Sequence, residues 1–137
     1  MWNCPVCDRI FQKVHQPHSC RKVSPGEHFK NKEGAKTLFE HLVKKIGAEI
    51  GPCKIISLPC CIHLYGAYDF LAALPKKDRL EIRFALPRKL ESRRLRQSVP
   101  LSLRNVKNCI DIRDEKEINA ELLGWIKESY YLKCGKN

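Results

Sequence analysis

The first twenty residues of the chain hold three cysteines, two histidines and a tryptophan, and few residues that could fill a hydrophobic core. Cys4 and Cys7 form a C-x-x-C pair, in which two thiolates can bind one tetrahedral cation from a tight turn. Cys20, with His15 or His18, completes a set of four ligands. A segment this short cannot bury enough apolar surface to fold by itself, whereas metal binding supplies the missing free energy. The pattern therefore predicts a zinc knuckle with a closed, structural site.

The fourth ligand is not settled by the first three. Spacing alone favours His15, because four residues separate it from Cys20, whereas His18 lies only two positions from Cys20. A C-x-x-C redox pair is the alternative to a metal site, but a βαβ pattern would be expected to follow it. Trp2 and Phe11 are expected to pack around the knuckle.

Length and hydropathy limit the number of domains and the kind of environment that we expect for the chain. The 137 residues suffice for one globular domain with a small appendage. No apolar run is long enough to cross a bilayer, so we expect no membrane contact. The N-terminus lacks the basic start, apolar stretch and cleavage site of a signal peptide, which predicts a cytoplasmic protein. Its clustered cysteines are therefore expected to bind metal rather than to form disulfides.

The chain divides into a knuckle, a linker and a larger domain. The knuckle covers residues 1–22, and residues 23–33 form a linker with turn-forming residues and no apolar period. Residues 34–133 are predicted to form an α+β domain, followed by a tail at 134–137. A helix is expected from about Gly34 to Ile50, where apolar residues recur at three- and four-residue spacing.

Short segments of β-branched, aromatic and aliphatic residues follow this helix. They predict strands at 53–58, 61–65, 68–74, 80–86 and 106–112. Apolar and polar residues alternate in 80–86, so one face of the sheet is expected to be exposed to solvent. A closing helix is expected from Asp114, which forms a capping box with Glu117. The predicted fold class is α+β, an antiparallel sheet of about four to five strands flanked by two helices, in the order helix, strands, helix.

Several motifs lie along this pattern. The opening reads W-x-C-P-x-C-x-x-x-F and ends in Q-x-H-S-C, and later come L-F-x-x-L (38–42), R-F-x-L-P-R-x-L-x-S (83–92) and W-I-K-E-S-Y (125–130). Together they resemble an uncharacterised bacterial family, domain of unknown function 5655. The resemblance implies His18 as the ligand beside Cys4, Cys7 and Cys20, with His15 as the alternative. The family is linked to nuclease-associated and DNA-related architectures in some longer proteins, which implies nucleic acid as a partner but no agreed activity.

Two blocks hold most of the net charge of +11. Residues 1–32 contain six basic and two acidic residues, and residues 74–96 contain nine basic and three acidic ones. Guanidinium groups can bind phosphates in bidentate fashion, although these arginines could instead pair with Glu81, Glu91 and the acidic start of the last helix. The residues predicted to contact nucleic acid are Arg88, Lys89, Arg93, Arg94 and Arg96 in the main domain and Arg9, Lys13, Arg21 and Lys22 in the knuckle.

Other candidate residues carry weaker signals. Cys60 and Cys61 are interpreted as small buried apolar residues, and no second metal site is expected. Tyr68 and Phe70 are expected in the core rather than stacked on bases. No nucleophile motif, phosphate-binding loop or pair of carboxylates indicates a reaction.

The sequence therefore predicts a non-catalytic, zinc-containing module that binds nucleic acid through basic surface blocks. A protein-interaction or adaptor domain of a bacterial or phage system is the alternative, with exposed apolar residues as the contact. The third hypothesis is a small-ligand or hydrolytic domain that uses His63, Tyr65 and Asp69 and requires a pocket.

Overall fold

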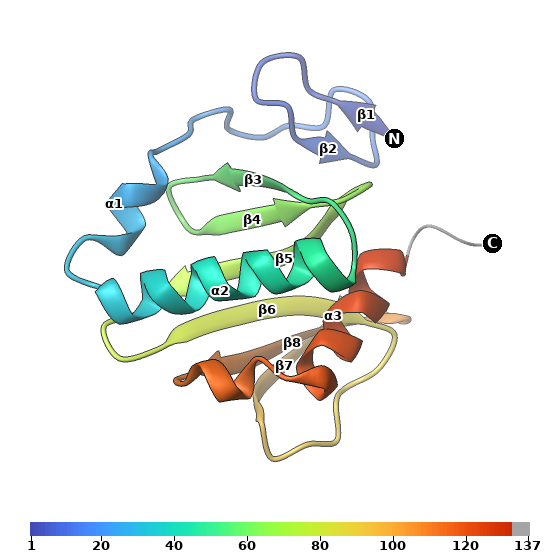
Figure 1. Cartoon of the computed structure of the whole chain (residues 1–137). Coiled ribbons are helices and arrows are strands. Elements are labelled where there is room, and N and C mark those ends of the chain that lie inside the picture. The colour runs from blue at the N-terminus through green and yellow to red at the C-terminus, as the bar shows by residue number, and fades with distance from the viewer. Residues whose placement is uncertain (133–137) are drawn as a thin grey trace.

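The computed structural model describes residues 1–132 and consists of a small two-stranded unit beside a larger α+β domain (Figure 1). The N-terminal unit contains β1 (Trp2–Asn3) and β2 (Ile10–Phe11). The helices that follow are α1 (Pro25–Phe29), α2 (Glu33–Glu49), a 3-10 turn at Glu115–Glu117 and α3 (Ala120–Tyr131). The larger sheet contains β3 (Lys54–Ser57), β4 (Ile62–Tyr65), β5 (Asp69–Pro75), β6 (Leu80–Leu86), β7 (Leu95–Ser102) and β8 (Asn105–Ile112).

The larger sheet is antiparallel throughout, with the strand order β3-β4-β5-β6-β8-β7. The predicted α+β class is confirmed, and the five predicted strands correspond to β3–β6 and β8. The sixth strand, β7, begins inside the basic block at Leu95. It was not predicted because it is an edge strand with exposed polar residues and Pro100, which an edge position tolerates.

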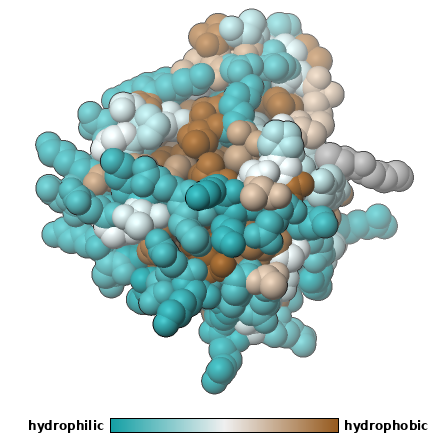
Figure 2. Space-filling model, viewed as in Figure 1, coloured by the Kyte–Doolittle hydropathy of each residue, from teal (hydrophilic) through white to brown (hydrophobic). Residues whose placement is uncertain are grey.

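Both long helices cover one face of this sheet and form the core with it (Figure 1). Leu42 and Ile46 of α2 and Leu122 and Ile126 of α3 are completely buried. They pack with the sheet residues Ile62, Leu64, Ile82 and Ile110. Figure 2 shows this helix-bearing side, where hydrophilic side chains predominate. Of the helices within residues 1–132, none has the length and apolarity needed to cross a membrane.

The helix boundaries differ from the prediction in two places. The predicted linker contains α1, which is capped by the Ser24 side chain and is too short to show an apolar period. The Asp114–Glu117 capping box is present, but it starts the 3-10 turn. Helix α3 itself begins at Ala120, where the Asn119 side chain accepts a hydrogen bond from the Leu122 N–H at 3.1 Å.

Tyr130 of α3 is held between two glycines that precede β3 and β5. Its hydroxyl donates to the Pro52 carbonyl at 2.7 Å. A Cβ atom on Gly66 would lie 2.7 Å from a ring carbon of Tyr130, and a Cβ on Gly51 would lie 2.7 Å from its hydroxyl oxygen. A side chain on either glycine would therefore collide with the Tyr130 ring, which also packs against the Phe70 ring.

We predict that Gly66→Ala lowers the free energy of unfolding by about 1–3 kcal/mol, because the added methyl group overpacks a confined ring. Gly124→Ala is the matched control, since an added Cβ there meets no atom within 4 Å. In the helix interior that change is expected to add about 0.5–1 kcal/mol of stability. Denaturant unfolding measures both effects, and a Gly66→Ala variant as stable as the wild type would contradict the packing argument.

Candidate metal centre and basic cleft

The turn around the C-x-x-C pair brings two cysteines to one point. The Cys4 N–H donates to the Arg9 carbonyl at 2.8 Å, and the Asp8 N–H donates to the Cys4 carbonyl at 2.8 Å. Asp8 has a φ of 66°, a left-handed conformation that aspartate tolerates better than most residues. Cys4 and Cys7 are both buried by this turn.

Cys20 and His18 complete a compact group with these two cysteines. The Cys4 and Cys20 sulfurs are 3.7 Å apart, and His18 Nε2 lies 3.3 Å from Cys7 Sγ and 3.4 Å from Cys20 Sγ. All four ligand atoms lie within 4.8 Å of one another. Around a tetrahedral zinc ion, two sulfurs lie about 3.8 Å apart and a sulfur and a nitrogen about 3.5 Å apart. The group therefore has the dimensions of a metal site.

Only one of the two histidines belongs to this group. His18 Nδ1 lies 2.6 Å from the Gln16 carbonyl, so it carries the proton and donates it, and Nε2 faces the sulfurs with its lone pair. His15 lies outside the group, and its ring is 5.1 Å from the Trp2 ring. The Phe11 ring lies 4.2 Å from the His18 ring, which confirms the predicted packing of aromatic residues around the knuckle.

The thiols of this group affect one another. A hydrogen bond from the Cys7 backbone lowers the pKa of Cys4 to about 6, outweighing the effect of burial. Burial and the neighbouring sulfurs of Cys4 and Cys7 raise the pKa of Cys20 to about 11. Without a cation the group therefore resists becoming fully ionised, and a bound metal ion would stabilise all of its thiolates.

The knuckle is docked on the first two strands of the large sheet (Figure 1). Arg9 Nε donates to the Tyr65 hydroxyl at 3.3 Å, and Lys54 pairs with Asp8 at 2.5 Å. Ile10 packs on a second apolar cluster formed by Ile56, Leu58 and Tyr65. This cluster is separate from the helix-covered core. The knuckle therefore covers only the β3–β4 end of the sheet.

The uncovered part of this face forms a cleft of about 730 Å³ beside the knuckle. The strand register places His63, Ala72, Arg83 and Cys109 opposite one another across β4, β5, β6 and β8. Ala72 and Ala85 line the cleft, and their side chains are too small to fill the space between their larger neighbours. The predicted exposure of one sheet face is thus correct for this part of the sheet.

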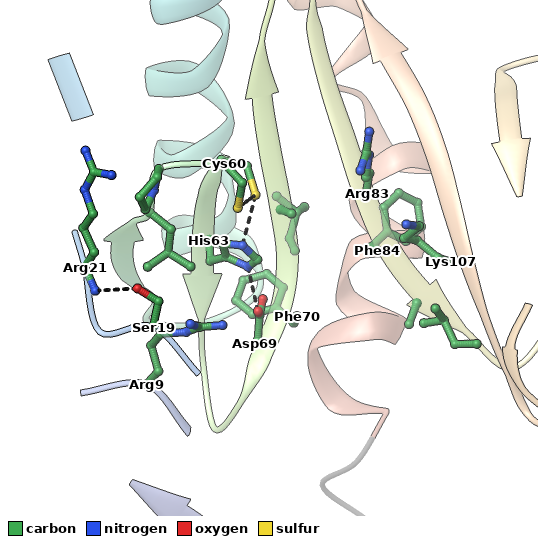
Figure 3. Close-up of a pocket in the computed structure, with 17 residues that line it drawn as sticks. Arg9, Ser19, Arg21, Cys60, His63, Asp69, Phe70, Arg83, Phe84 and Lys107 are labelled. Carbon is green, nitrogen blue, oxygen red and sulfur yellow. Dashed lines mark hydrogen bonds and ion pairs between the residues drawn. The ribbon is translucent and has the colours of Figure 1, made fainter. Parts of the chain in front are cut away.

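Both parts of the molecule contribute cations to the cleft. Figure 3 shows Arg9 and Arg21 of the knuckle on one side and Arg83 and Lys107 of the sheet on the other. Arg83 pairs with the buried Glu81 at 2.7 Å. Among residues 1–132, Arg21 and Lys107 have no carboxylate within ion-pair distance. These two cations are therefore available to an anionic ligand.

The other predicted nucleic-acid contacts lie elsewhere. Three arginines of the main basic block are engaged in ion pairs, two of them with α3. The pairs are Arg88 with Glu128, Arg94 with Glu121 at 3.2 Å, and Arg96 with Glu81 at 2.7 Å. The remaining predicted cations are exposed but do not line the cleft: Lys13, Lys22, Lys89 and Arg93. The structure therefore brings together only Arg9 and Arg21 of the nine predicted residues at this cleft.

A second Cys/His group lies in the wall of the cleft and was missed in the sequence. Cys60 Sγ is 3.0 Å from Cys61 Sγ, which is 3.1 Å from His63 Nε2, and His63 Nδ1 donates to Asp69 at 2.6 Å. The prediction that Cys60 is buried is wrong, because it lies in the loop before β4 and is exposed. The spacing C-C-x-H, followed by Asp69, was the available signal.

Asp69 also changes what His63 can do. Burial lowers the pKa of His63, but its hydrogen bonds and charge interactions with Asp69 and Cys61 together outweigh burial and raise that pKa to about 10. A histidine with this pKa is protonated at neutral pH and does not act as a general base. The cleft supplies the pocket that the hydrolytic hypothesis requires, but a protonated His63 cannot serve as its general base.

Comparison with known proteins identifies the larger domain. A family model described as "Domain of unknown function (DUF5655)" matches residues 26–133. The match begins after the Cys/His group of the knuckle, so it rests on the α+β domain alone. No curated protein and no solved structure matches the chain significantly.

Proposed function

We propose that this chain, which belongs to the DUF5655 family, is a zinc-stabilised module that binds nucleic acid in the cleft between its knuckle and its sheet. The family name carries no activity, so the proposal is built from the residues. The observation that carries it is the cleft of about 730 Å³, to which both parts of the molecule contribute cations. The net charge of +11 adds a long-range attraction for polyanions.

Zinc is the metal that best fits the knuckle. Three thiols and one imidazole suit its preference for sulfur and nitrogen ligands. With Cys4, Cys7, His18 and Cys20 as ligands, no coordination position remains for a substrate, so the ion has a structural role. It holds the segment that carries Arg9 and Arg21 beside the sheet.

The contacts in the cleft suit phosphates rather than bases. Arg21 and Lys107 supply positive charge, which binds the backbone of any sequence. Tyr65, Tyr68 and Phe70 are at most 5% exposed, so their rings do not offer a stacking platform. We therefore expect affinity that depends strongly on salt and weakly on sequence.

The test compares two double variants that remove the same charge. Arg21→Ala with Lys107→Ala alters the cleft, whereas Lys89→Ala with Arg93→Ala removes exposed cations outside it. The cleft variant is expected to bind a labelled oligonucleotide about tenfold more weakly, and the slope of log affinity against log salt should fall by about two. Fluorescence anisotropy across a salt series measures both quantities.

The control variant is expected to retain most of the affinity and the salt slope of the wild type. An equal loss in the two double variants would mean that the charge acts diffusely rather than through the cleft. A loss confined to the Lys89/Arg93 variant would place the contact at Lys89 and Arg93, in the basic block at 74–96.

A specific observation supports a protein partner as the second candidate function. Val6 and Val14 of the knuckle are 77% and 68% exposed, and Leu101 and Leu103 near the β7–β8 turn are 57% and 105% exposed. Figure 2 shows hydrophobic residues on the knuckle at the top of the molecule. An adaptor role would use these side chains and would be insensitive to loss of Arg21 and Lys107.

A further inference from the structure

We propose that Cys60, Cys61 and His63 form a second metal site, which binds a thiophilic cation such as Zn²⁺ and keeps one coordination position open to the cleft. The three ligand atoms lie within 4.8 Å of one another. They come from the loop before β4 and from β4 itself. The site stands on this geometry alone and does not depend on nucleic-acid binding.

Asp69 prepares His63 to be a ligand. Its carboxylate accepts the Nδ1 proton at 2.6 Å, and this bond directs Nε2 at the Cys61 sulfur 3.1 Å away (Figure 3). A metal ion would displace the proton on Nε2 and leave the Nδ1 bond to Asp69 in place. The knuckle uses the same arrangement, with the Gln16 carbonyl in place of the carboxylate and His18 Nε2 facing two sulfurs. A carboxylate behind a histidine is a recurrent partner of metal-bound imidazole, because it fixes the ring and raises its basicity.

The three ligands can reach the dimensions of a metal site with little movement. The Cys60–Cys61 and Cys61–His63 distances of 3.0 Å and 3.1 Å are shorter than those in the knuckle. Opening them to the edges of a zinc tetrahedron requires shifts of about 0.5–0.8 Å. Cys60 is exposed and precedes the strand, so its side chain can make this adjustment without disturbing the core.

The surroundings predict a weaker and more accessible site than the knuckle. Cys60, Cys61, His63 and Asp69 all line the cleft, so the fourth coordination position faces solvent. The nearby cations Arg9 and Arg83 also line it and oppose a further positive charge. Two thiolates and the Asp69 carboxylate offset that repulsion. We therefore expect a second ion that a chelator removes before the first.

The experiment measures how many zinc ions each full-length chain binds under reducing conditions. Metal-free protein is titrated with Zn²⁺ against a chromophoric chelator, and the bound ions are counted by native mass spectrometry. The wild type is expected to bind two ions per chain with distinct affinities. Cys60→Ser is expected to bind one, with the tighter affinity unchanged. Cys53→Ser is the matched control, because Cys53 belongs to neither group, and it should bind two.

Cobalt provides a second readout. Co²⁺ in a site with thiolate ligands gives sulfur-to-metal charge-transfer bands, and these bands should lose intensity in Cys60→Ser. His63→Ala should also bind one Zn²⁺ ion, and Asp69→Asn should bind the second ion about 10–100-fold more weakly, as expected of a positioning residue. Because Cys60 is exposed, Cys60→Ser keeps the test decisive if the His63 variant fails to fold.

The proposal is overturned if the wild type binds a single ion, or if Cys60→Ser still binds two with unchanged affinities. Either outcome would leave Cys60 and Cys61 as neighbouring thiols beside a His63–Asp69 ion pair. Neither outcome bears on the basic cleft, because Arg21 and Lys107 are not changed.

Discussion

Replacing Cys4 with serine is expected to release the knuckle's metal ion and to unfold residues 1–20 while the α+β domain stays folded. Cys4 is a buried member of the Cys/His group proposed to bind zinc, and a serine hydroxyl binds zinc poorly. Structural zinc contributes about 10–16 kcal/mol to the folding of small fingers at neutral pH, so little of the knuckle's stability would remain. The larger domain has its own core under α2 and α3, which does not include the knuckle.

Zinc content and amide hydrogen exchange measure the two halves of this expectation. The amides of residues 1–20 should lose protection, whereas those of β5 and β6 should keep it. Cys53→Ser again provides the control, because it makes the same chemical change outside both Cys/His groups. Retained N-terminal protection in Cys4→Ser, or in chelator-treated wild type, would show that the knuckle folds without metal.

The second large effect is expected at Asn108, a completely buried polar residue of β8. Its Oδ1 accepts from the Leu90 N–H at 3.0 Å, and its Nδ2 donates to the carbonyls of Arg88 and Val106 at 3.1 Å and 3.2 Å. These bonds fix the segment between β6 and β7. Asn108→Ala would leave the buried Leu90 N–H without this acceptor and would remove two further hydrogen bonds to backbone carbonyls. We therefore expect a loss of about 3 kcal/mol in the free energy of unfolding.

Denaturant unfolding tests this expectation. Asn105→Ala, three positions earlier at the start of the same strand and only partly buried, is the matched control and should change stability by less than about 0.5 kcal/mol. If Asn108→Ala is equally mild, the segment is held by other contacts, such as the burial of Leu90.

Much of the fold was predictable because it depends on local pattern. Helix α2 and strand β6 carry apolar residues at the spacing that burial of one face requires, and β5 is a short, almost continuously apolar run. The edge strand β7 has no such requirement. It is held by backbone hydrogen bonds to β8, and these bonds leave no pattern of side chains in the sequence.

In the candidate sites too, local spacing in the sequence was informative, whereas contacts between distant segments were not predictable. Cys4, Cys7 and Cys20 were predicted from their spacing, which favoured His15, and His18 was chosen over His15 only through the family resemblance. The structure places His18 beside the three sulfurs. Charge counting located the basic block, and the alternative that its arginines pair with Glu81 and with the acidic start of the last helix is correct for Arg96 and Arg94. The Arg88–Glu128 pair was not predicted, because Glu128 lies near the end of that helix. The cleft could not be predicted, since strand register and the docking of the knuckle bring its residues together.

The most direct test of the proposed function is the binding of zinc-loaded protein to short single- and double-stranded DNA and RNA across a salt series. We predict binding to at least one form of nucleic acid with a dissociation constant of about 1–100 μM or lower near physiological salt, and an affinity that falls steeply as salt rises. Dissociation constants above about 100 μM for every form near physiological salt would contradict nucleic-acid binding in the cleft and would favour a protein partner.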